Sequence, residues 1–320
     1  MTSNRKHNGK NPILTAILTV IAAILVLMRI FNAEDPAQTD PSATAAPTPT
    51  VTPIAQAVQP TDETESGMTL TVLEVGKADC LVLQCDGESM IIDGGNNDDE
   101  DYILAQLDAL GIEWFKYLVN THPHEDHLGS LDAVTYYFPI QQAILSPKEH
   151  TTANYERLLT ALEDREVPVH IAQRGDTFQL GGATLTVLSP AENAEYEGYN
   201  DWSVLLMAQY GDVRFLLMGD AEKPVEGDLL DSGDDLRADV IKIGHHGSQT
   251  SSKKSFLSAV SPTYALITCD RTVEAGEPNA KVAGYLDDLG VETLRTDLSG
   301  VITVYTDGTD VAITTERQAP

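Results

Sequence analysis

Ten residues, Thr121-His-Pro-His-Glu-Asp-His-Leu-Gly-Ser130, constrain the fold more than any other part of the chain. They place three of the eight histidines and an aspartate within six residues: His122, His124, Asp126 and His127. Imidazole and carboxylate groups are ligands of zinc and similar ions, and a site generally needs three or four of them. Alternate residues of an extended segment point the same way, so His122 and His124 can face one ion together. Asp126 and His127 follow where a turn could direct them to a second ion.

The segments on either side of this motif indicate where it lies in the fold. Tyr117-Leu-Val-Asn120 is apolar and typical of a buried strand, and Leu128-Gly-Ser-Leu-Asp-Ala-Val134 resembles the start of a helix. Open α/β folds carry their chemistry at strand ends, just before helices. The alternative is a solvated histidine-rich loop or a few hydrogen-bonded core histidines, but the spacing of the motif favours a metal site.

Two later segments also end apolar strands in potential ligands. Leu216-Leu-Met-Gly-Asp220 ends in a carboxylate that could bridge two ions, although Gly-Asp at a strand end is more often a turn. Asp239-Val-Ile-Lys-Ile-Gly-His245-His246 ends in adjacent histidines. One could bind metal while the other reaches the substrate or a carboxylate behind the ligands. In Asn200-Asp-Trp-Ser203, Asn200 could donate a hydrogen bond to a substrate or bind a metal weakly, and a plain turn is the alternative.

The N-terminus carries a candidate membrane anchor. Residues 1–11 are polar and basic, and residues 12–32 form an apolar segment that just reaches the roughly 17–25 residues of a membrane-spanning helix. Basic residues before the apolar run favour a cytoplasmic tail and a single-pass signal anchor. A cleaved signal peptide is the competing interpretation, but Arg29 ends the apolar run and no convincing cleavage site follows.

The remainder divides into a linker and one domain. Residues 33–66 are rich in proline, threonine and alanine, so they favour an extended spacer. Residues 67–320 are long enough for a single domain with a sizeable core. The formal net charge is −29, from 20 basic and 49 acidic residues, so the overall field opposes a stable nucleic-acid complex. Cys80, Cys85 and Cys269 lie in apolar strand-like contexts, which favours burial over a disulfide framework.

Short apolar strands alternate with helical patterns along the domain. Strands are predicted at 68–75, 81–85, 89–93, 117–120, 183–188, 203–209, 213–218, 240–243, 263–268, 301–306 and 311–315, with a hairpin turn at Asp86-Gly87. Helices are predicted at 102–110, 152–165, 255–260 and 280–289, and one from about residue 128. Two mixed sheets packed face to face, with helices outside, fit this order.

With these motifs in place, the chain resembles the metallo-β-lactamase superfamily, whose signature is His-x-His-x-Asp-His. Within it, the likeness is to the extracytoplasmic hydrolase domain of ComEC-type DNA-uptake proteins. Five further segments carry that likeness: Leu73-Glu-Val-Gly-Lys-Ala-Asp79, Ile91-Ile-Asp-Gly-Gly95, Asn200-Asp-Trp-Ser203, Gly219-Asp220 and His245-His246-Gly-Ser248. Together with the histidine motif they span nearly the whole globular part.

The chain also departs from these relatives. Their multi-helix channel and oligonucleotide-binding region have no counterpart here, so we do not expect a complete transporter. Glu277-Pro278 stands where many relatives have His-Pro. The third-motif histidine of the superfamily is replaced near Asn200, which leaves the first ion with fewer side-chain ligands.

The resemblance implies an α+β fold, a four-layer αβ/βα sandwich, with a two-metal site in the cleft between its halves. His122 and His124 would bind the first ion. Asp126 and His127 would bind the second ion, and Asp220 would bridge the two. His246 would complete the set of ligands around the second ion, with His245 as the alternative ligand. Asp126, Asp220 and His246 would therefore carry catalysis. The residues in supporting or substrate-contacting positions would be His245, Asn200, Ser203, Lys242, Asp93 and Asp79.

The implied function is that of a membrane-anchored, extracytoplasmic, metal-dependent hydrolase. Two divalent ions about 3.5–4 Å apart can share a hydroxide formed from water at neutral pH. Zinc is favoured, with manganese as the alternative, and a phosphodiester of a wall polymer is the preferred substrate. A nuclease acting on DNA is the second hypothesis, and a non-catalytic surface binding protein is the third. We expect a monomer that contacts the membrane only through residues 12–32.

Overall fold

The computed structural model describes residues 66–270 and 276–318. The predicted cytoplasmic tail, the predicted membrane helix at 12–32 and nearly all of the predicted linker lie outside the described residues. Within the described ranges, no helix is long and apolar enough to cross a membrane.

The first of two sheets has eight strands in the order β15-β14-β1-β2-β3-β4-β5-β6. Its strands are β1 (Met68–Val72), β2 (Leu81–Cys85), β3 (Glu88–Ile92), β4 (Phe115–Asn120), β5 (Ile140–Leu145), β6 (Val169–Ile171), β14 (Ile302–Thr306) and β15 (Val311–Thr315). Pairing is antiparallel from β15 to β3 and parallel from β3 to β6. The predicted hairpin turn is confirmed, since Asp86 and Gly87 both have positive φ between β2 and β3.

The second sheet has seven strands in the order β13-β12-β11-β10-β9-β8-β7. Its strands are β7 (Thr177–Leu180), β8 (Ala183–Ser189), β9 (Leu205–Tyr210), β10 (Val213–Leu217), β11 (Val240–Lys242), β12 (Tyr264–Ile267) and β13 (Glu292–Arg295). It is antiparallel from β7 to β10 and parallel from β10 to β13. The prediction of two mixed sheets is therefore confirmed.

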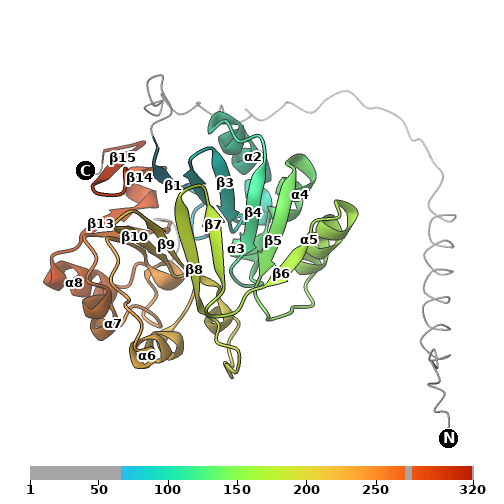
Figure 1. Ribbon diagram of the computed structural model, residues 1–320. Coiled ribbons are helices and arrows are strands. Elements are labelled where there is room, and N and C mark those ends of the chain that lie inside the picture. Colours follow the sequence, from blue (N-terminus) through green and yellow to red (C-terminus); the bar gives the residue numbers. More distant parts are fainter. Residues whose placement is uncertain (1–65, 271–275, 319–320) are drawn as a thin grey trace, which may run out of the picture. The chain divides into compact units, whose positions relative to one another are not determined.

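The two sheets pack face to face, with helices on their outer faces (Figure 1). Alternate residues of the strands, such as Leu83 and Val119 of one sheet and Leu206 and Phe215 of the other, meet in a central core. The helices beside the first sheet are α2 (Glu100–Ala109), α3 (Glu125–Leu128), α4 (Leu131–Tyr137) and α5 (Ala153–Asp164). Those beside the second sheet are α6 (Lys223–Ser232), α7 (Lys254–Val260) and α8 (Ala280–Leu289), and the short α9 (Thr296–Ser299) precedes β14. The described domain has the predicted four-layer order.

Several elements were not predicted, and their residues explain why. β5 carries two glutamines in its first half, while β6 and β7 have only three and four residues and alternate in exposure. α6 contains Pro224 and Gly227, which weaken its helical pattern, although proline in the first turn is itself a helix-start signal. The predicted burial of Cys80, Cys85 and Cys269 is confirmed, and all three are free thiols.

Candidate metal centre

The predicted site residues meet where three strands end. Residues 122–127 follow β4 in the first sheet, Asp220 follows β10 in the second, and residues 245–246 follow β11 beside it. β10 and β11 are parallel neighbours, so their carboxyl ends lie at the same edge of the sheet. The sheets are joined at this point, because the Val204 amide donates to the Thr121 carbonyl across 2.9 Å.

Gly219 allows the two sheets to approach so closely. Its φ is +49°, and a Cβ there would lie 3.1 Å from the side chains of both Ser203 and Thr121. Its carbonyl accepts a hydrogen bond from the His245 amide at 3.1 Å. A larger residue would be strained in this backbone conformation and would push Asp220 away from the histidine motif.

Four residues form what we call the compact group: Asp126, His127, Asp220 and His246. Their potential ligand atoms all lie within 4.8 Å of one another. Asp220 Oδ1 is 3.3 Å from His127 Nε2 and 3.5 Å from His246 Nε2. His246 Nε2 is also 3.6 Å from Asp126 Oδ2. Two imidazoles and two carboxylates thus converge on one small volume.

The compact group fits a divalent cation. His127 Nε2, Asp220 Oδ1 and His246 Nε2 are inaccessible to solvent and have no hydrogen-bond partner among the described residues. Leaving such a buried polar atom unpaired costs about 1–3 kcal/mol. A cation between them would satisfy all three atoms at once, and the mixture of nitrogen and oxygen donors suits zinc or manganese.

The other predicted ligands form what we call the open group: His122, His124 and His245, with the second oxygen of Asp220. His122 Nε2 faces His124 Nδ1 at 3.0 Å. Asp220 Oδ2 lies 3.9 Å from His122 Nε2 and 3.8 Å from His245 Nε2. No three of these residues reach the 4.8 Å spacing of the compact group. His122 is buried, but His124 and His245 are partly exposed.

Asp220 therefore offers one oxygen to each group. Burial opposes its ionisation, but His127 and His246 outweigh burial and hold the pKa of Asp220 well below its usual range. The Asp220 amide donates to Ser203 Oγ at 3.1 Å, and that hydroxyl also lies 3.4 Å from His122 Nδ1. Ser203 thus contacts both Asp220 and His122 on the side that faces away from the centre.

Asp93 lies behind His127 and does not face the centre. Its Oδ2 is 2.7 Å from His127 Nδ1 and accepts a 2.6 Å hydrogen bond from Thr121 Oγ1. A proton on Nδ1 leaves Nε2 free to act as a ligand, the usual arrangement for a histidine backed by a carboxylate. Burial raises the pKa of Asp93.

A chain of three residues lies behind His246. Thr268 Oγ1 is 2.9 Å from His246 Nδ1 and donates to Asp79 Oδ1 at 2.6 Å. Lys242, fully buried, pairs with Asp79 Oδ2 at 3.0 Å. Asp79 and Lys242 therefore hold His246, a candidate ligand, in place from behind. Thr268 was missed from sequence, although it ends the predicted strand 263–268 at the same sheet edge.

The structure separates the two adjacent histidines. His245 and His246 have φ values of +48° and +53°, a left-handed conformation that costs roughly 1–2 kcal/mol per residue. Their rings consequently diverge: His246 faces Asp220 Oδ1, and His245 faces Asp220 Oδ2. His245, the predicted alternative ligand of the second ion, thus lies with the open group, beside Asp220 Oδ2.

Glu222, which sequence reasoning missed, anchors His245. Its Oε1 lies 2.9 Å from His245 Nδ1 and accepts hydrogen bonds from Thr250 Oγ1 at 2.9 Å and Asn200 Nδ2 at 3.1 Å. The Asn200 amide group is therefore directed to Glu222. The spacing of Glu222, two residues after the predicted bridging aspartate, was the available sequence signal.

The two groups also differ in protonation. Burial, with repulsion from His127, lowers the pKa of His122 well below its usual value, and burial lowers that of His124. Burial also disfavours protonated His127, but the carboxylates of Asp220 and Asp93 prevail and raise its pKa well above the usual value. Without metal, the compact group therefore holds a proton that a cation must displace.

A family model described as the metallo-beta-lactamase superfamily matches residues 73–269. The chain therefore belongs to the metallo-beta-lactamase superfamily, and it has a metallo-hydrolase fold with candidate residues for two metal ions. Among curated proteins, ComE operon protein 3 of Bacillus subtilis (strain 168) is 29% identical over 203 residues, which are 63% of this chain and 26% of that protein. Competence protein ComA of Neisseria gonorrhoeae is 28% identical over 240 residues, 74% of this chain and 32% of that protein. The predicted likeness to ComEC-type competence proteins is confirmed.

The chain spans about a quarter to a third of the length of these relatives. Among solved structures, the metallo-beta-lactamase fold protein YhfI from Bacillus subtilis has a TM-score of 0.52 at 11% identity, covering 73% of this chain and 98% of that one. A variant of the beta-hydroxylase CmlA has a TM-score of 0.50 at 13% identity, covering 74% and 53%. At such identities the likeness shows the fold alone.

Proposed function

We propose that this chain is a membrane-anchored, extracytoplasmic phosphodiesterase that uses two divalent metal ions, with zinc favoured over manganese. One observation carries the proposal: the two oxygens of Asp220 face two separate sets of imidazole nitrogens. A carboxylate so placed can bridge two cations. Two-metal centres are typical of phosphatases, nucleases and other enzymes that cleave phosphate esters.

The side chains divide the chemical work. When bound, two ions lower the pKa of water toward 7 and neutralise the charge that develops on a phosphoryl group. Asp126 and His246 hold one side of the centre, and Asp220 keeps both sides in register. Burial opposes protonation of His245, yet Glu222 and Asp220 outweigh it and raise its pKa. Glu222 holds His245 at Nδ1, which leaves Nε2 directed toward Asp220 Oδ2 on the open side of the centre.

A direct assay tests this activity. The purified full chain, loaded with zinc or manganese, should hydrolyse bis-p-nitrophenyl phosphate and a polyol phosphate polymer, and should leave a β-lactam intact. Stripping the metal with a chelator should stop hydrolysis, and adding it back should restore the rate. Turnover of the β-lactam with no turnover of any phosphodiester would refute the proposal.

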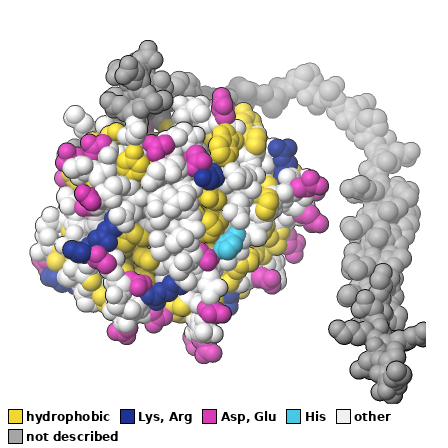
Figure 2. Space-filling view, viewed as in Figure 1, with side chains coloured by type: hydrophobic (Ala, Val, Ile, Leu, Met, Phe, Trp, Pro, Cys, Tyr) yellow, Lys and Arg dark blue, Asp and Glu magenta, His cyan; other side chains and the backbone are white. Residues whose placement is uncertain are grey.

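A nuclease is the second candidate, because the two curated relatives described above carry the names of a ComE operon protein and a competence protein. The acidic charge of the chain opposes binding of any long polyanion, and this holds for DNA and for a polyol phosphate polymer alike. Acidic side chains are spread over the face shown in Figure 2, and Lys and Arg form only isolated groups among them. A DNA substrate run beside the polymer decides between the two, and faster cleavage of DNA would favour the nuclease.

The membrane anchor rests on the apolar run at residues 12–32 and the basic residues before it. Protease added to intact cells should remove the globular domain and leave a short membrane-bound stub. Complete protection of the domain in intact cells, with digestion after lysis, would place it on the other side of the membrane.

A further inference from the structure

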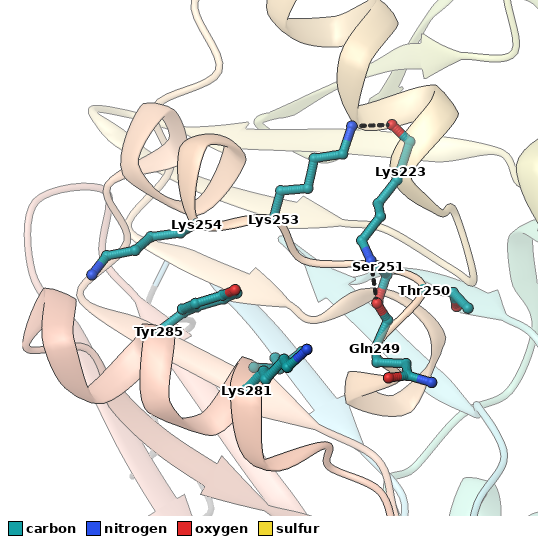
Figure 3. A pocket seen from close by; sticks show the side chains of 9 residues that line it. Lys223, Gln249, Thr250, Ser251, Lys253, Lys254, Lys281 and Tyr285 are labelled. Carbon is teal, nitrogen blue, oxygen red and sulfur yellow. Dashed lines mark hydrogen bonds between the residues drawn. The ribbon is translucent and has the colours of Figure 1, made fainter.

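A pocket lined by four lysines lies on the second-sheet side of the molecule. Its volume is about 390 Å³. The residues around it come from the starts of α6, α7 and α8 and from the loop after β11 (Figure 3). They are Lys223, Gln249, Thr250, Ser251, Lys253, Lys254, Lys281, Val282 and Tyr285. In a chain with a net charge of −29, such a concentration of positive charge is unexpected for a mere solvated surface.

The charge in this lysine pocket is only partly compensated, because the buried Glu226 carboxylate attracts Lys253 and Lys223 without forming an ion pair with either. Lys254 pairs with Asp288 at 2.6 Å. No carboxylate of the described residues forms an ion pair with Lys223, Lys253 or Lys281. Instead, the ammonium of Lys253 donates to the Lys223 carbonyl at 2.8 Å, and that of Lys223 donates to the Gln249 carbonyl (Figure 3). These bonds to backbone hold the ammonium groups in position and leave their charge intact.

Two of the lysines occupy positions that oppose helix stability. Lys223 begins α6, and Lys281 lies in the first turn of α8. A cation near a helix N-terminus is unfavourable by about 0.3–1 kcal/mol, because that end already carries positive partial charge. An anion held in the pocket would add negative charge near these helix N-termini, which is favourable there. Local violations of this kind are expected at functional sites.

The pocket adjoins the open group of the metal centre. Thr250, part of its wall, donates to Glu222 Oε1 at 2.9 Å, and its hydroxyl lies 3.1 Å from His245 Nδ1. Ser251, also part of the wall, donates to the Gly244 carbonyl at 2.7 Å, next to His245 in the chain. The buried Glu226 carboxylate accepts the amides of Ser252 and Lys253, which fixes this loop. Thr250 is therefore shared between the wall of the lysine pocket and the surroundings of His245.

We propose that the lysine pocket binds a phosphate of the substrate chain, one or more units away from the phosphodiester at the metal centre. The inference rests on the proposed phosphodiesterase function and deepens it: the substrate is a chain of repeated phosphodiesters without stacking bases, for which poly(glycerol phosphate) is the probe. Lysine is a suitable point charge for phosphate. DNA fits less well, because single-strand binding uses a continuous basic groove with aromatic stacking platforms. The pocket is compact, and Tyr285 is its one aromatic residue.

Steady-state kinetics of the full chain tests the proposal. The double variant Lys223→Gln/Lys281→Gln should lower kcat/KM for a poly(glycerol phosphate) about tenfold relative to kcat/KM for bis-p-nitrophenyl phosphate, which carries a single phosphate and has none left for the pocket. Lys116→Gln is the matched control, because Lys116 lies in β4 and does not line the pocket. It should leave this ratio unchanged. Lys281→Gln alone, an exposed residue, covers the case in which the double variant fails to fold.

A binding measurement separates the pocket from the catalytic proposal. Asp220→Ala, which lacks the bridging carboxylate, should still bind a glycerol phosphate oligomer in calorimetry, with affinity that weakens as salt rises. Adding Lys281→Gln should weaken that binding severalfold. If bis-p-nitrophenyl phosphate is not hydrolysed, the proposed function fails whatever the pocket does. If it is hydrolysed but neither the kinetic ratio nor oligomer binding changes, the pocket is not a subsite. Pocket-dependent binding of a DNA oligonucleotide in place of the glycerol phosphate oligomer would overturn the polymer class.

Discussion

The compact and open groups share one aspartate but differ in how the fold supports them. In the compact group, His127 and His246 are fully buried, and each has a hydrogen-bonding partner behind the nitrogen that faces away from the centre. In the open group, His124 and His245 are partly exposed, and Glu222, also partly exposed, supports His245. Rigid support orients ligands before the ion arrives, so the compact group should bind its ion more tightly.

The shared residue should give the largest effect. Asp220→Ala removes an oxygen ligand from both sides, so we expect loss of at least one metal equivalent and a fall in kcat of more than about 10³-fold. Asn200→Ala removes the contacts of one amide group with Glu222 and His245, and should cost less than the 10²–10³-fold typical of one transition-state donor. Metal analysis and circular dichroism of both variants must accompany the rates. Near wild-type turnover with both ions in Asp220→Ala would show that the site is misplaced.

The buried support behind the compact group should contribute to folding stability. Lys242→Met leaves the Asp79 carboxylate buried without its lysine partner, and breaking a buried ion pair costs about 3–5 kcal/mol. Lys116→Met breaks the partly exposed pair with Glu88 and should cost less than about 1 kcal/mol. Urea unfolding of the metal-free chain measures both. Equal losses of unfolding free energy in the two variants would mean that the buried Lys242–Asp79 pair stabilises the fold no more than a surface ion pair does.

Thr268→Val and Glu222→Gln test the two sides separately. Removing the hydroxyl behind His246 should weaken binding of one ion about 10–100-fold, the usual effect of changing a partner behind a ligand. Glu222→Gln keeps the shape of the side chain and should leave that ion in place, with a smaller loss on the other side. Competition with a chromophoric chelator gives both affinities. If Glu222→Gln weakened binding of the tighter ion and Thr268→Val did not, the two residues would have to be assigned to the opposite groups.

The pH dependence of metal binding should follow His127. Its pKa is raised above the usual value without metal, so it is protonated below that pKa and the proton competes with the cation. Affinity of the compact group should therefore rise with pH, by up to about tenfold per unit, and level off above the pKa of His127. Calorimetry in buffers of different ionisation enthalpy should detect about one proton released. No proton release at pH 7 would contradict the carboxylate-held imidazolium.

The sequence predicted the two mixed sheets and the residues that converge at their edge because both depend on local patterns. Apolar strands ending in His, Asp or Gly-Asp identify a sheet edge, and the His122–His127 spacing identifies metal chemistry. β6 and β7 were not predicted, because strands of three and four residues with mixed polarity lack a periodic hydrophobic pattern. Those elements are defined by the neighbours they pair with.

The division of labour among the site residues could not be predicted in the same way. An extended chain would have separated the rings of His245 and His246, but the two left-handed residues decide which ring faces which oxygen of Asp220. Thr268 and Glu222 are distant in sequence from the histidine motif, and their roles follow from side-chain packing across strand ends. Such contacts appear only in three dimensions.

A zinc titration of the metal-free full chain, followed by calorimetry, tests most directly the claim that one aspartate joins two unequal metal sites. We predict two binding steps of different affinity that sum to two equivalents. His124→Ala should abolish the weaker step and leave the tighter one. A single step of one equivalent, or loss of the tighter step in His124→Ala, would contradict the account.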